Sequence, residues 1–152
     1  MPLYYFDTSG LIKHYVPEIG SERVDALLVQ EAAAVAAIVR VEVASALARR
    51  AREGGLTTAQ RDTLYARFLN DLSDMIIVPL DEALLARAAD LARTSTLDAP
   101  LRALDAIHLA SAFVIFETHP PEDGSAGTFI TADRQLGRAA EHAGLRVIDP
   151  EA

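Results

Sequence analysis

The sequence predicts an α/β protein in which helices cover both faces of a mostly parallel sheet, as in a three-layer sandwich. Short apolar runs of strand length alternate along the chain with longer helical segments, and some strands are separated by a pair of helices. The 152 residues, 51% of them hydrophobic, suffice for one closed core, and no linker divides them. We therefore expect a single domain spanning residues 1–152.

Five segments have the composition of strands. The expected strands are Leu3–Phe6, Ala33–Ala37, Met75–Pro79, Thr128–Thr131 and Arg146–Ile148. The first contains three aromatic residues and ends in a turn at Asp7–Gly10. The second is the weakest candidate, because it is poor in β-branched residues.

Helices are expected between these strands, with capping residues at several of their starts. The expected helices cover residues 11–15, 21–30, 38–53, 57 or 58 to 72, the segment from the Asp81 cap to about Thr94–Thr96, residues 102–117 and residues 134–143. Residues 119–127 are the only stretch rich in Pro and Gly, and we expect them to form a surface loop.

Composition excludes several functional classes. Without cysteine there are no disulfides and no thiolate metal sites, which fits a reducing cytoplasm. Apolar runs such as Ala110–Phe116 are shorter than the roughly 20 residues that span a bilayer, so no membrane association is expected. A net charge of −8 argues against a protein that coats nucleic acid, but not against a nuclease.

Four acidic residues at the ends or on the apolar faces of separate segments are the main functional signal: Asp7, Glu42, Asp105 and Asp133. Carboxylates repel one another and are costly to desolvate, so a fold that gathers four of them needs a cation. Oxygen ligands suit Mg²⁺, for which Mn²⁺ can substitute. The sequence therefore predicts a magnesium site if the four side chains meet.

Asp7 and Asp133 each follow a predicted strand. In an open parallel sheet, sites form beyond the carboxyl ends of the strands, so both residues are expected at the functional edge. The alternative is that each is simply the N-cap of the next helix.

Glu42 and Asp105 lie within predicted helices. Glu42 shares its helical face with apolar and small residues, where an unpaired glutamate is rare. Asp105 belongs to a polar stripe on an otherwise apolar helix, together with Arg102, His108 and Ser111. The alternatives are ion pairs of Glu42 with Arg40 or Arg49 and of Asp105 with Arg102. We expect His108 to be a satisfied structural group.

These segments, taken together, resemble the PIN-domain ribonucleases, and within them the VapC toxins of toxin–antitoxin pairs. The resemblance rests on Phe6–Ser9, on Val41-Glu42, on the run Leu104–Ala110 and on Phe129–Leu136, in this order over almost the whole chain.

The resemblance implies a PIN-like fold and metal-dependent cleavage of RNA. It implies that Asp7, Glu42, Asp105 and Asp133 form the acidic quartet, with Asp7 and Asp105 as the firmest metal ligands. Ser9 and Thr131 would adjust the surroundings of the metal. The partners implied are RNA, a cognate antitoxin that inserts a segment into the cleft, and a second copy in a homodimer.

The chemistry is that of a metal-activated water, and Arg134 or Arg102 are candidates to orient the phosphate. Two other functions stay open at this point. One is a structure-specific DNA nuclease with the same acidic site. The other is a non-catalytic binding module whose acidic residues are helix caps and salt bridges.

Overall fold

The strands form one five-stranded sheet in which every neighbouring pair is parallel, as the computed structural model of residues 2–152 shows. They are β1 (Leu3–Phe6), β2 (Ala32–Ala36), β3 (Ile76–Val78), β4 (Thr128–Ile130) and β5 (Arg146–Ile148). Their order across the sheet is β3-β2-β1-β4-β5. The chain builds outward from β1 to one edge and from β4 to the other, so the topological switch lies between β1 and β4.

Seven α-helices and one short 3₁₀ helix connect and flank these strands in the described part of the chain. They are α1 (Thr8–Leu11), the 3₁₀ helix η1 (Ile12–His14), α2 (Ser21–Gln30), α3 (Val39–Arg52), α4 (Thr58–Leu72), α5 (Glu82–Arg93), α6 (Ala103–Thr118) and α7 (Arg134–His142). The caps at Thr57 and Asp81 form as expected: Thr57 Oγ1 accepts from the Gln60 amide and Asp81 Oδ1 from the Leu84 amide.

The predicted fold class is confirmed, and most predicted elements agree with the structure to within one residue at each end. The segment after β1 was predicted wrongly. In place of a turn at residues 7–10 and a helix over 11–15, α1 begins at Thr8 and passes into η1. The reason is Asp7, whose side chain accepts from the Gly10 amide and caps the helix at once.

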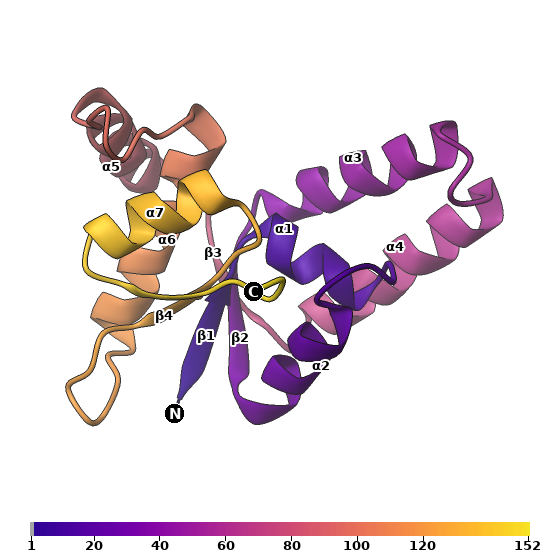
Figure 1. Cartoon of the computed structure of the whole chain (residues 1–152), viewed down its shortest axis with the longest axis horizontal. Coiled ribbons are helices and arrows are strands. Elements are labelled where there is room, and N and C mark those ends of the chain that lie inside the picture. Colours follow the sequence, from indigo (N-terminus) through magenta and orange to yellow (C-terminus); the bar gives the residue numbers. More distant parts are fainter. Residues whose placement is uncertain (1) are drawn as a thin grey trace.

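The helices cover both faces of the sheet, giving three layers (Figure 1). One core packs α5, α6 and α7 against the sheet around Tyr5, Leu109 and Phe129. The other packs α1 to α4 against the opposite face around Phe6, Val35 and Phe68. Helices α3 and α4 run side by side and extend beyond the sheet (Figure 1).

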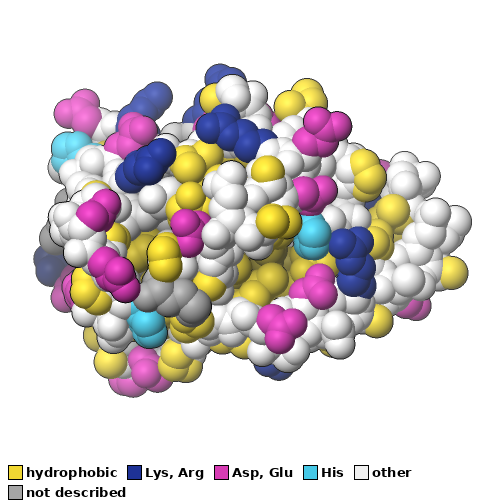
Figure 2. All heavy atoms as spheres, turned by 90° about the horizontal axis from the view of Figure 1, so that it is seen from below, with side chains coloured by type: hydrophobic (Ala, Val, Ile, Leu, Met, Phe, Trp, Pro, Cys, Tyr) yellow, Lys and Arg dark blue, Asp and Glu magenta, His cyan; other side chains and the backbone are white. Residues whose placement is uncertain are grey.

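The two ends of the strands differ in character. Figure 2 views the molecule from the side on which β1 begins, and it shows acidic, basic and hydrophobic side chains interspersed, with no broad basic surface. The acidic residues singled out in the sequence belong to the other side, where β1 and β4 end. Among residues 2–152, no helix combines the length and the apolar character that a bilayer crossing requires.

Candidate active site

The candidate site begins at the switch between β1 and β4. Because the strands are parallel and adjacent, the segments that follow them emerge at the same edge of the sheet. The Asp7 amide donates to the carbonyl oxygen of Ile130 at 3.2 Å, which joins the two strand ends directly. Gly10 lies so close to β4 that a Cβ atom there would be 3.0 Å from the Ile130 oxygen, so the close approach of α1 requires glycine.

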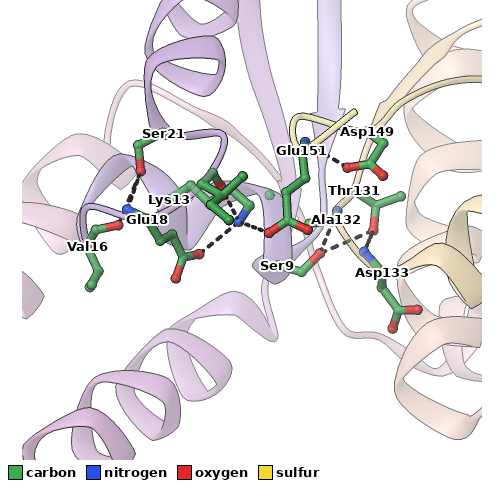
Figure 3. Close-up of polar contacts among 12 residues, drawn as sticks. Ser9, Lys13, Val16, Glu18, Ser21, Thr131, Ala132, Asp133, Asp149 and Glu151 are labelled. Carbon is green, nitrogen blue, oxygen red and sulfur yellow. Dashed lines mark hydrogen bonds and ion pairs between the residues drawn. The ribbon is translucent and has the colours of Figure 1, made fainter. Parts of the chain in front are cut away.

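Asp7 is the most enclosed carboxylate of the site, with 3% of its surface exposed. Its oxygens accept from the Gly10 amide at 2.9 Å, from Ser9 Oγ at 2.9 Å and from Thr131 Oγ1 at 2.8 Å. The Ser9 hydroxyl in turn accepts from the Ala132 amide at 3.0 Å. Figure 3 shows Ser9 directed toward Thr131 and Ala132. Ser9 and Thr131 therefore fix the orientation of Asp7.

Burial raises the pKa of Asp7 above the ordinary aspartate value. The positive charge of His108 and the three hydrogen bonds act in the opposite direction, but they do not outweigh the loss of water. The ionised form of Asp7 is thus short of compensating positive charge. A site of this kind stabilises a cation that enters it.

Glu42 is held by a hydrogen-bonded chain that crosses from α3 to the sheet. Its Oε1 accepts from Thr8 Oγ1 at 2.8 Å and is hydrogen-bonded to His108 Nε2 at 2.6 Å. His108 Nδ1 is hydrogen-bonded to the buried hydroxyl of Tyr5 at 2.7 Å. Neither Arg40 nor Arg49, the partners considered from the sequence, makes this contact.

His108 is surrounded by acidic groups. Burial alone would lower its pKa, but the hydrogen bond to Glu42 and the charges of Asp7, Glu42 and Asp105 outweigh burial, so the pKa is raised. Burial likewise acts to raise the pKa of Glu42, but His108 and Thr8 lower it overall. Both ring nitrogens of His108 have hydrogen-bond partners, as predicted for a satisfied structural group.

Asp105 and Asp133 are joined through Arg102. Arg102 Nε donates to Asp105 Oδ2 at 3.1 Å, and Arg102 Nη2 donates to Asp133 Oδ2 at 2.7 Å. Asp133 Oδ1 also accepts from the Gln135 and Leu136 amides and caps α7. The salt bridge and the cap considered as alternatives in the sequence are therefore both present.

The structure thus places the four acidic residues at one edge of the sheet, with Glu42 bound to His108 and with Asp105 and Asp133 joined by Arg102. Within residues 2–152, however, no group of three or more His, Cys, Asp or Glu side chains is arranged as a metal site. Arg102 and His108 stand between the carboxylates instead. The oxygens of the four carboxylates are the kind of ligand that Mg²⁺ and Mn²⁺ prefer.

Two hollows adjoin this edge. A cleft of about 550 Å³ runs along α3 and is lined at one end by Thr8, Ser9 and Glu42. A smaller hollow of about 250 Å³ contains Thr131, Asp133 and the exposed Arg134. Arg134 therefore lies next to the acidic group, but outside the larger cleft.

The sequence reasoning missed the contacts of Tyr5 and Thr8. Tyr5 had no signal beyond its place in an apolar strand, and its hydroxyl became important only when α6 packed over β1. Thr8 was visible as the neighbour of Asp7, but its pairing with Glu42, 34 positions away, is a product of the tertiary fold.

Comparison with known proteins agrees with this architecture. The PIN-domain family model matches residues 4–142. The chain is 33% identical over 149 residues to the ribonuclease VapC45 of Mycobacterium tuberculosis, covering 97% of this chain and 95% of that protein.

Two solved structures share the fold. A toxin-antitoxin complex from Klebsiella pneumoniae has a chain that matches with a TM-score of 0.60 and 21% identity, over 97% of both chains. A chain of FitAB bound to a DNA fragment matches with a TM-score of 0.66 and 22% identity, over 98% of this chain and 96% of that one. The sequence motifs, the five-stranded parallel sheet and these matches together show that the chain belongs to the PIN-domain family, alongside the VapC-type ribonucleases.

Proposed function

We propose that the protein is a metal-dependent endoribonuclease and the toxin of a VapBC-type toxin–antitoxin pair. The observation that carries the proposal is the pair of linked contacts beside the β1–β4 switch: Glu42 is hydrogen-bonded to His108, and Arg102 joins Asp105 to Asp133, next to the buried Asp7. Similarity to a VapC ribonuclease over nearly the whole chain supports the activity.

The carboxylate oxygens present are of the type that suits a hard divalent cation, although the side chains would have to leave Arg102 and His108 to surround it. Asp7 and Asp105 would hold Mg²⁺ or Mn²⁺, with Glu42 and Asp133 binding directly or through water. The raised pKa of Asp7 supports this assignment, because a buried carboxylate that lacks compensating charge gains most from a cation. When bound, the ion supplies an activated water at neutral pH and offsets charge on the scissile phosphate.

The protein's own groups then have distinct tasks. Ser9 and Thr131 hold Asp7 in one orientation, and His108 does the same for Glu42. Arg102 keeps Asp105 and Asp133 together and must release them to a metal ion. Once freed, its exposed guanidinium can bind an oxygen of the RNA phosphate, as can Arg134. No side-chain nucleophile is needed.

The partners follow from the same proposal. A chain of similar fold occurs in a toxin-antitoxin complex, which supports a cognate antitoxin as the protein partner. A homodimer and a cytoplasmic location belong to the same proposal, and the absence of cysteine fits the latter.

The test is cleavage of RNA by purified protein with Mg²⁺ or Mn²⁺, with and without EDTA. We expect cleavage only with metal, and Asp105→Asn should abolish it at saturating Mg²⁺. Cleavage that persists in EDTA would exclude the mechanism. A DNA strand of matched sequence, assayed in parallel, decides between RNA and DNA as substrate.

A second readout does not depend on activity. Binding of Mg²⁺ to the folded state should raise the melting temperature of the wild type, and much less that of Asp105→Asn. If Mg²⁺ shifts neither protein, the acidic residues act as caps and salt bridges, and the chain is a non-catalytic binding module.

A further inference from the structure

The cleft along α3 connects the acidic edge with a group of basic residues. Its lining consists of Thr8, Ser9, Ile12, Lys13, Glu18, Val41, Glu42, Ser45, Ala46, Arg49, Arg50, Leu104, Ala132 and Glu151. Glu42 and Arg49 lie seven residues apart on α3, close to two helical turns and about 10 Å along the axis. One face of α3 thus carries a carboxylate of the candidate active site and, further along, a guanidinium.

Two of the three basic residues of the cleft are already neutralised. Lys13 Nζ donates to Glu18 Oε1 at 3.0 Å, to Glu151 Oε1 at 2.8 Å and to the Ile19 carbonyl at 2.8 Å. Arg50 Nη2 donates to Glu18 Oε2 at 2.7 Å. Figure 3 shows Lys13 between Glu18 and Glu151, with Glu151 lying toward Ser9.

Arg49 differs from both. It is exposed, and it is the one cation of the cleft that makes no hydrogen bond or ion pair with any of residues 2–152. Next to it in sequence, the buried Arg50 Nε atom also has no hydrogen-bond partner in the described chain. Because that atom is enclosed, the guanidinium that the cleft can offer to a ligand is that of Arg49.

We propose that Arg49 forms a subsite for a backbone phosphate of RNA, away from the phosphate that is cut. The inference rests on the proposed function, since it concerns how the same cleft holds its substrate. A guanidinium binds a phosphate through two parallel hydrogen bonds, and a strand that passes Glu42 brings further phosphates along the cleft. Such a contact positions RNA but does not read its sequence.

A protein segment is the less suitable occupant of the Arg49 end, which leaves the Glu42 end of the cleft for the expected antitoxin segment. A segment that neutralises the acidic residues must carry cationic side chains, and these would meet Arg49 with like charge. RNA carries negative charge at every nucleotide and matches the cationic end of the cleft. At the acidic end, its charge is offset by the proposed metal.

The experiment compares Arg49→Gln with Arg52→Gln, both placed in an Asp7→Asn background so that the RNA is not cut. Arg52 is an exposed arginine on the same helix that does not line the cleft, so it controls for the loss of charge alone. Binding of a fluorescein-labelled single-stranded RNA of mixed sequence is measured by anisotropy over a range of NaCl concentrations.

Arg49→Gln should weaken binding about tenfold, the loss expected when a charge-assisted hydrogen bond is removed. The slope of log Kd against log salt should fall by about 0.7, the value for one phosphate contact to a single strand. Arg49→Lys should keep the slope and recover part of the affinity, since it retains the charge but not the paired donors. With Asp7 restored, Arg49→Gln should raise KM more than it lowers kcat.

The subsite is overturned if Arg49→Gln matches Arg52→Gln in affinity and in salt slope. It is overturned as an RNA site if Arg49→Gln binds RNA normally but loses binding to a polyglutamate peptide, because the occupant is then an acidic protein segment. These outcomes are separate from failure of the proposed function. If the wild type cleaves RNA with metal but Arg49→Gln has no effect, only the subsite is wrong. If RNA binding depends on Arg49 but no cleavage is seen, only the nuclease activity is wrong.

Discussion

Two groups of charged side chains adjoin the cleft, and they differ in the balance between positive and negative charge. The first group reaches the cleft through Glu42; among residues 2–152, its four carboxylates (Asp7, Glu42, Asp105 and Asp133) lie near two cationic partners, Arg102 and His108. At the other end, Lys13 and Arg50 are matched by Glu18 and Glu151. The first group carries an excess of negative charge, whereas the four paired residues of the second are balanced and leave Arg49 as the unpaired cation beside them.

The balanced group serves the stability of the fold, and the unbalanced group is suited to a function. Balanced ion pairs satisfy their members and hold segments together; here Lys13, only 3% exposed, ties the loop before α2 to Glu151. An unbalanced group keeps a carboxylate such as Asp7 in a state that the fold alone does not stabilise, which is typical of sites that await a ligand. Substitutions in the two groups should therefore have opposite effects on stability.

Asp7→Asn should have the largest effect on activity, a loss of at least about a hundredfold, because it removes a carboxylate that the proposed mechanism assigns to the metal. The melting temperature should rise instead of fall. Burial raises the Asp7 pKa, so its ionisation weakens the folded state once the pH exceeds the ordinary aspartate value. Removing a penalty of about 1 kcal/mol corresponds to about 2–4 °C. RNA cleavage and calorimetry measure the two effects; a large fall in melting temperature would contradict the charge argument.

Lys13→Met should lower the stability of the protein, in contrast to the rise in melting temperature expected for Asp7→Asn. The change leaves Glu18 with Arg50 alone and Glu151 without its cation, and the expected loss is about 2 kcal/mol, or about 4–8 °C in melting temperature. Urea unfolding measures it. A variant as stable as the wild type would show that the balanced group does not stabilise the fold.

The pH dependence of stability tests whether the effect of Lys13→Met comes from the loss of its ion pairs. Burial alone lowers its pKa, but the hydrogen bonds to Glu151 and Glu18 outweigh burial, so the pKa is raised above 10.5. The stability from these ion pairs is therefore fully present below about pH 10.5 and is lost as the pH rises through the raised pKa. The difference in stability between wild type and Lys13→Met should narrow in that range.

Substitutions of Asp133 should have the smallest effects, but two of them separate its role as helix cap from its role in the candidate site. Asp133→Ala loses the cap of α7, at about 1 kcal/mol, and the link to Arg102. Asp133→Asn keeps the cap, since asparagine is an equally good N-cap. Both should lower cleavage by about 10–100-fold, the range for groups that support a metal site, while only the alanine variant melts earlier. If Asp133→Asn cleaves like the wild type, Asp133 is a cap and nothing more.

Much of the fold was predictable because its signals are local. The aromatic run of β1, the β-branched residues of β3 and the Thr57 and Asp81 caps each specify their element within a few residues. The start of α1 was missed although Asp7 was considered as a cap, because the local signal did not show that Gly10 packs against Ile130, 120 positions away, and lets the helix begin at once.

The sequence by itself determined the α/β class, the family and the identities of the four acidic residues. Each depends on residue type and order, which survive without coordinates. Only the tertiary structure decided which cation each acidic residue meets: His108 reaches Glu42 because α6 packs across β1 near α3, and Arg102 spans Asp105 and Asp133 because α6 and α7 begin at the same edge. The balance of charge in each group depends on distance and burial, and those are set only when the layers come together.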